Sequence, residues 1–106
     1  MPDIVGGYTY LTGRTPLPQL WTLGYHQSRW GYDSADCIKK VAGKYRELNI
    51  PCDTMHFDID YMDGYRVFTW NEKDYGDPAE TIQELADDGF KAVCIIDPGV
   101  KLDPGY

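Results

Sequence analysis

The sequence has 106 residues, of which 42% are hydrophobic, 25% charged and 14% aromatic. This length and composition predict one globular domain with a modest core and exclude a disordered chain. A net charge of −7 opposes binding to nucleic acid and to anionic membranes. No run of about 18 apolar residues is present to span a membrane, and no signal peptide is recognisable. We expect a soluble chain that binds neutral ligands; its compartment stays open, with the cytoplasm favoured over secretion.

The amino-terminal segment, residues 1–18, is rich in Gly, Thr, Pro and Tyr. Glycine and proline at this density disfavour a long regular element, so the segment is predicted to be a lead-in or a short docked piece. A first strand is predicted from Leu20 to Tyr25. A polar and aromatic loop, residues 27–33, follows it.

The next segment has the pattern of an amphipathic helix. Ser34 is the predicted N-cap, and Asp36 places an acid in the first turn. Asn49 and Pro51 mark the end of the helix. Its apolar residues recur at helical spacing and form one face for packing on a sheet: Ile38, Val41, Ala42, Tyr45 and Leu48.

A second strand, Cys52 to Ile59, runs into the carboxylates Asp58 and Asp60. A buried strand that ends in acids is how a parallel α/β sheet presents chemistry at its carboxyl edge, so this stretch is the best candidate for a site. The alternation from Tyr65 to Trp70 predicts a short extra strand within a long loop.

A second helix is predicted to begin at Asp77-Pro78 and to end at Gly89. The third strand, Lys91 to Ile96, is apolar on both faces, as in a parallel strand that is covered on both sides. The predicted order is β-α-β-(β)-α-β. It describes a small open α/β sheet or a piece of a (β/α)₈ barrel, which needs about 250 residues when complete.

Several side chains have more than one interpretation. Asp58 and Asp60, two apart on a strand, would point the same way about 7 Å apart and could be a catalytic pair; we favour a binding role for Asp58. We favour sugar contact for Trp30 and core packing for Tyr32.

The histidines and cysteines do not indicate a metal site or a cofactor. His26 and His56 are interpreted as hydrogen-bonded core residues, because no carboxylate or cysteine stands at ligand spacing. Cys37, Cys52 and Cys94 are an odd number without CxxC spacing, so we expect buried thiols and neither a disulfide framework nor zinc.

Several blocks, in chain order, resemble glycoside hydrolase family 31, and the resemblance to its α-glucosidase branch is close. They are YLTG at 10–13, LGYHQSRWGY at 23–32, Ile50-Pro51 with Asp53, DIDYMD at 58–63, Phe68-Thr69 and Ile96-Asp97-Pro98. The resemblance implies a partial (β/α)₈ TIM barrel: the first two βα units and the third strand in residues 19–106. Residues 1–18 would be the end of the preceding domain.

The resemblance also implies which residues serve the sugar. Asp58 would accept hydrogen bonds from sugar hydroxyls in the −1 subsite, and Ile59, Trp30 and Ile95 would line the apolar face of the sugar. The family's nucleophile lies in a W-x-D-M-N-E type motif, which this sequence lacks. Neither catalytic carboxylate is therefore expected here.

The leading hypothesis is a fragment of a retaining α-glucosidase that acts on oligosaccharides, with the fragment alone inactive. The alternative is a non-catalytic carbohydrate-binding α/β module, and a third hypothesis is an interaction protein that uses an open strand edge. Because the barrel would be incomplete, we expect the fragment to self-associate.

Overall fold

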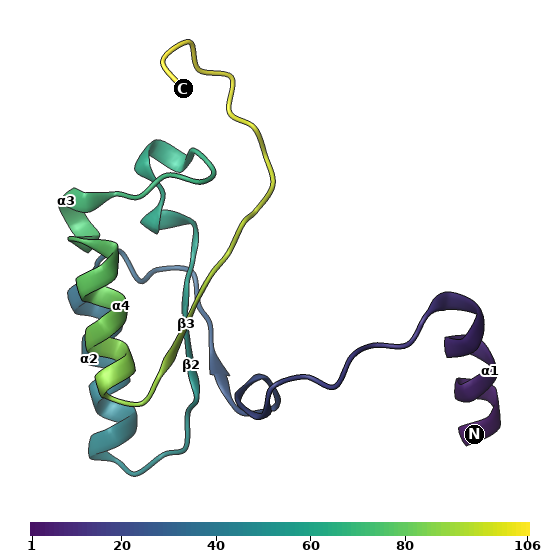
Figure 1. The fold of residues 1–106 in the computed structure, drawn as a ribbon. Coiled ribbons are helices and arrows are strands. Elements are labelled where there is room, and N and C mark those ends of the chain that lie inside the picture. Colours follow the sequence, from purple (N-terminus) through teal and green to yellow (C-terminus); the bar gives the residue numbers. More distant parts are fainter.

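A computed structural model describes all 106 residues and shows a small parallel sheet with helices on one side (Figure 1). The strands are β1 (His26–Gln27), β2 (Thr54–Phe57) and β3 (Lys91–Cys94), in the order β1-β2-β3. Thr54 in the central strand pairs with His26 and with Lys91, and both pairings are parallel. All three strands therefore end at the same edge of the sheet.

The helix α2 (Ala35–Glu47) confirms the predicted amphipathic helix. The Ser34 hydroxyl accepts a hydrogen bond from the Cys37 N–H at 3.3 Å, which caps the first turn. Ile38 and Ala42 are completely buried, whereas Leu48, at the end of the predicted stripe, is 59% exposed. The packed face is therefore shorter than the sequence pattern suggested.

The helix α4 (Pro78–Asp87) confirms the second predicted helix and lies beside α2 (Figure 1). Asp77 accepts hydrogen bonds from the N–H groups of Ala79 and Glu80, at 2.7 and 3.1 Å. An ion pair between Lys39 and Glu84 joins the two helices.

The position predicted for the first strand, Leu20 to Tyr25, was wrong. Residues Leu20–Leu23 form a 3₁₀ turn, η1, and the strand begins only at His26. The Gln19 carbonyl accepts hydrogen bonds from both the N–H and the hydroxyl of Thr22, so local contacts replace strand pairing. Gly24 then passes so close to Asp53 that a Cβ would lie 1.9 Å from a carboxylate oxygen.

The extra strand predicted from Tyr65 to Trp70 does not form. Tyr65 and Phe68 both have a φ of 60°, which is left-handed and not extended. The loop instead contains two 3₁₀ turns, η2 (Ile59–Tyr61) and η3 (Asp63–Tyr65), and a short helix, α3 (Glu72–Tyr75), that the sequence analysis missed.

The amino-terminal segment also differs from expectation, because Pro2–Thr12 forms the helix α1. Proline at the first helical position and Asp3 in the first turn favour a helix start. The helix buries no residue and stands apart from the sheet (Figure 1). The division of the chain at residue 18 stays a prediction.

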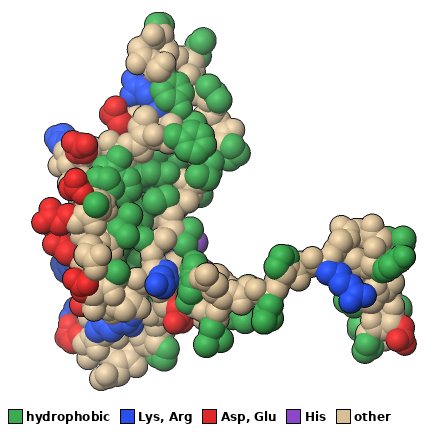
Figure 2. Space-filling model, in the orientation of Figure 1, with side chains coloured by type: hydrophobic (Ala, Val, Ile, Leu, Met, Phe, Trp, Pro, Cys, Tyr) green, Lys and Arg blue, Asp and Glu red, His purple; other side chains and the backbone are tan.

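The core lies between the helices and one face of the sheet. Phe57, Tyr61, Trp70 and Tyr75 form an aromatic cluster with ring centroids 5.4 to 6.5 Å apart. Only 15 of the 106 residues are buried, so the core is small for a chain of this length. Figure 2 shows hydrophobic side chains gathered over the strands and over the loops that follow them.

No helix of the chain is both long enough and apolar enough to cross a membrane.

Candidate substrate-binding site

The candidate site lies at the edge of the sheet where the three strands end. Asp58 and Ile59 follow β2 directly, and Ile95 follows β3. The Ile95 N–H donates to the Phe57 carbonyl at 3.0 Å, and the Tyr61 hydroxyl donates to the Ile95 carbonyl at 2.8 Å. These contacts hold the end of β3 against the residues that carry Asp58 and Ile59.

Asp58 is half-buried and has one oxygen that is committed to the fold. Its Oδ1 atom accepts a hydrogen bond from the Ile59 N–H at 2.8 Å, which caps η2. The second oxygen has no hydrogen-bond partner within the chain. The capping bond fixes the carboxylate, and its free oxygen can accept a hydrogen bond from a sugar hydroxyl. Such a bond suits a sugar, because charge-assisted hydrogen bonds are about twice as strong as neutral ones.

The three residues predicted to line the apolar face of the sugar differ in how deeply their side chains are buried. Ile59 packs against the core, and Ile95 is 38% exposed. Trp30 lies in the loop after β1 and is 68% exposed, so its ring is free to stack on a ligand. Tyr32 is buried, which confirms core packing for that residue.

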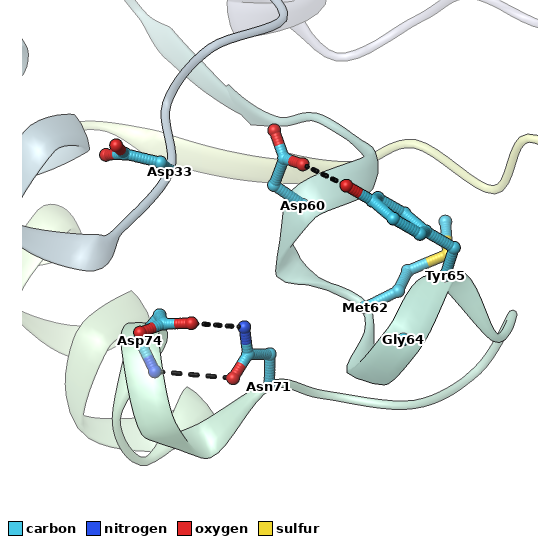
Figure 3. Close-up of a pocket in the computed structure, with 7 residues that line it drawn as sticks. All are labelled: Asp33, Asp60, Met62, Gly64, Tyr65, Asn71 and Asp74. Carbon is cyan, nitrogen blue, oxygen red and sulfur yellow. Dashed lines mark hydrogen bonds between the residues drawn. The ribbon is translucent and has the colours of Figure 1, made fainter.

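Asp60 has different partners from Asp58, and the strand geometry on which a catalytic pair was predicted does not form. The strand ends at Phe57, so Asp60 lies within η2 and not two residues along a strand. Its Oδ1 accepts a hydrogen bond from the Tyr65 hydroxyl at 3.1 Å (Figure 3). Asp60 and Tyr65 line an open pocket of about 310 Å³. Its other lining residues are Asp33, Met62, Gly64, Asn71 and Asp74.

The two histidines lie together beneath this edge. His26 Nδ1 and His56 Nε2 are 3.1 Å apart, and the Trp21 ring stacks on His26 at a centroid distance of 5.9 Å. Burial lowers the pKa of His56, and so does the neighbouring His26. Both rings are partly buried and hydrogen-bonded to each other, which agrees with the interpretation in part. Neither ring belongs to the buried core, and His26 Nε2 is buried without a hydrogen-bond partner.

The cysteines are unpaired in the structure. Cys52 is buried, whereas Cys37 and Cys94 are only partly buried, so the expectation of buried thiols is confirmed for one of the three. Burial raises the pKa of the Cys94 thiol, which favours its protonated form. No group of three or more His, Cys, Asp or Glu side chains is placed to hold a metal ion.

Parallel strands that alternate with helices, with polar side chains after the strands, define the repeating unit of a β/α barrel. Residues 15–106 match the model of the glycosyl hydrolases family 31 TIM-barrel domain. The chain belongs to this family, and it is a partial (β/α)₈ barrel made of two βα units and a third strand.

Its relatives are much longer proteins. The chain is 45% identical over 104 residues to alpha-glucosidase 2 of Bacillus thermoamyloliquefaciens, covering 98% of the chain and 13% of that protein. It is 43% identical over 105 residues to human neutral alpha-glucosidase AB, covering 98% of the chain and 11% of that protein. The chain therefore spans only about an eighth of each.

Solved structures agree with the sequence relatives. A crystal structure of the ER glucosidase II heterodimeric complex matches with a TM-score of 0.90 and 41% identity, over 98% of this chain and 11% of that one. A family 31 alpha-glucosidase from Bacteroides thetaiotaomicron matches with a TM-score of 0.86 and 41% identity, over 98% of this chain and 18% of that one. Since the first is an ER protein, the preference for the cytoplasm has no support among these relatives.

Sequence reasoning missed how the site loop is held. Arg66, Lys101 and Asp103 carry contacts between the loop after β2 and the loop after β3. Arg66 and Asp103 are 37 residues apart in sequence, so no local pattern could have paired them.

Proposed function

We propose that this chain is the beginning of the catalytic barrel of a retaining α-glucosidase that hydrolyses α-glucosidic bonds of oligosaccharides. In this proposal Asp58, Ile59, Trp30 and Ile95 form part of the −1 sugar subsite. Residues 1–18 would belong to the domain before the barrel. The names of the relatives support the class of reaction, because alpha-glucosidases match over 98% of the chain.

One observation carries the binding role: the half-buried carboxylate of Asp58 follows the central strand and keeps one oxygen free of partners in the chain. Ligand sites of β/α barrels lie at this end of the strands. The exposed parts of Ile95 and Trp30 supply apolar surface at the same edge. A glucose ring presents both hydroxyls and an apolar face, which suits this combination.

The chain itself does not supply the chemistry. Retaining hydrolysis needs two carboxyl groups about 5 to 5.5 Å apart across the bond, one as nucleophile and one as acid/base. Asp58 caps η2 and Asp60 accepts from Tyr65, so each has a structural partner. The proposal places both catalytic carboxyl groups on later strands.

The test compares the full-length protein with the isolated chain. We expect the full-length protein to hydrolyse 4-nitrophenyl α-glucoside and to release the α-anomer of glucose first, as detected by proton NMR. The isolated chain should be inactive and should bind glucose with a dissociation constant above about 1 mM, which corresponds to about −4 kcal/mol. Micromolar binding in calorimetry, together with an inactive full-length protein, would favour the carbohydrate-binding module instead.

A further inference from the structure

The loop after β2 and the loop after β3 are joined by an ion pair that the candidate site does not use. Arg66 Nη2 contacts Asp103 Oδ2, and the two side chains are only 23% and 20% exposed. The backbone N–H of Gly105 and the Arg66 guanidinium hold the pKa of Asp103 below its usual range. Asp103 is therefore ionised at neutral pH, and the partial burial of both side chains limits the screening of the ion pair by salt.

Further hydrogen bonds connect the same two loops. Lys101 Nζ donates to the Gly64 carbonyl at 2.7 Å, and the Tyr106 hydroxyl donates to the Val67 carbonyl at 2.7 Å. Arg66 Nη1 also donates to the Asp63 carbonyl within its own loop, at 3.1 Å. Arg66 therefore contacts both η3, in its own loop, and the loop after β3.

The loop backbone next to these contacts has left-handed φ angles, which residues with a side chain rarely adopt. Gly64, Tyr65 and Phe68 have φ values of 54°, 60° and 60°. Such conformations persist only where the surroundings over-determine them. The contacts to Arg66 and Lys101 supply this restraint on both sides of Tyr65.

The restrained backbone leads directly to the candidate site. Tyr65 donates its hydroxyl to Asp60 at 3.1 Å, and Asp60 belongs to η2, the turn that Asp58 caps. Displacement of residues 63–66 would therefore break the Tyr65–Asp60 hydrogen bond, which restrains η2 on its solvent-facing side.

We propose that Arg66 and Asp103 are a pair of positioning residues that lock the loop after β2 to the loop after β3 and so fix the orientation of Asp58. Neither residue touches the sugar. The proposal rests on the −1 subsite assigned above, so its test needs one readout that depends on activity and another that does not.

The test uses the full-length protein with Arg66→Met, Asp103→Asn, the double variant and Arg66→Lys. We expect each of the first two to lower kcat/KM by about tenfold or more, since small misplacements of a site cost up to about 100-fold. The double variant should lose less than the product of the two single losses, because Asp103→Asn alone takes the nearer of two carboxylate partners from a poorly exposed guanidinium and leaves only Asp63, at 3.6 Å. Arg66→Lys should recover part of the activity.

Hydrogen exchange measured by mass spectrometry on peptides covering residues 62–70 is the second readout. Exchange should become faster in Arg66→Met and Asp103→Asn, and stay at the wild-type rate in a matched control. The control removes the exposed pair on α2, with Lys44→Met and Glu47→Gln, whose side chains are 57% and 62% exposed. Its kcat/KM should also be unchanged.

Folded Arg66→Met and Asp103→Asn variants with wild-type kcat/KM and wild-type exchange would overturn the proposal. So would a lower melting temperature with unchanged kcat/KM per folded molecule, since that result means a purely structural role. If the wild-type protein hydrolyses no α-glucoside, the proposed function fails. Faster exchange over 62–70 in Arg66→Met and Asp103→Asn would then still show that this ion pair holds the two loops together, and unchanged exchange would refute it.

Discussion

In the full-length protein, Asp58→Asn is expected to lower kcat/KM for an α-glucoside by about 10- to 150-fold. The carbonyl oxygen of asparagine can still accept from the Ile59 N–H and cap η2, so the fold should be retained. What is lost is the charged partner of a sugar hydroxyl, worth about 1.5 to 3 kcal/mol, and each 1.4 kcal/mol is a factor of ten. Steady-state kinetics on purified, folded protein measures the effect.

Asp36→Asn is the matched control for this variant. Asp36 is an exposed acid in the first turn of α2, on the helical side of the sheet. Its removal should change kcat/KM by no more than about twofold, as for most surface substitutions. Comparable losses in Asp36→Asn and Asp58→Asn would count against a substrate contact for Asp58.

The isolated 106-residue chain is expected to self-associate at tens of micromolar. The outer edges of β1 and β3 have no partner strand. One face of the sheet and its loops leave large apolar side chains in water: Leu23 at 69%, Tyr25 at 51% and Phe68 at 84% exposed. Apolar surface in water costs about 25 cal/mol per Å², and open strand edges recruit further strands.

Light scattering during dilution measures this association, and a thermal scan supplies the second criterion. We propose edge pairing or stacking of the open faces, so the apparent mass should exceed that of a monomer and fall on dilution. A chain that remains monomeric at this concentration and unfolds in one sharp transition would close its own core. That behaviour would contradict the account of the chain as an open piece of a barrel.

The elements that sequence reasoning predicted well are the ones with strong local signals. Ser34 and Asp77 are side-chain caps, and each helix begins one residue after its cap. The largely apolar residues before Asp58 and after Gly89 predicted two parallel strands, of which β2 is mostly buried and β3 is only partly buried. In these cases the chemistry that starts or pairs an element lies within a few residues of it.

The errors arose where contacts elsewhere in the chain decide the conformation. The apolar stretch Leu20–Leu23 fits a strand by composition, but Leu20 and Leu23 stay exposed and the stretch forms a 3₁₀ turn. The alternation in residues 65–70 fits a strand as well, but contacts from Lys101 and Asp103 hold that loop in left-handed conformations. No window of local sequence contains those partners.

The candidate site was predictable in its location and not in its details. That acids and apolar residues would meet at the carboxyl edge follows from parallel strands alone, and Asp58 and Ile95 do follow neighbouring strands. The different surroundings of Asp58 and Asp60 required the structure, because η2 turns the second acid away from the strand direction.

A crystal structure of the full-length protein with glucose bound tests the central claim most directly. The account predicts an Asp58 oxygen within about 2.5 to 2.7 Å of a sugar hydroxyl, as for a charge-assisted O–H···O⁻ hydrogen bond. It also predicts Ile59, Trp30 and Ile95 within about 4.5 Å of the ring. A glucose molecule bound in the catalytic barrel with Asp58 out of hydrogen-bonding reach would contradict it.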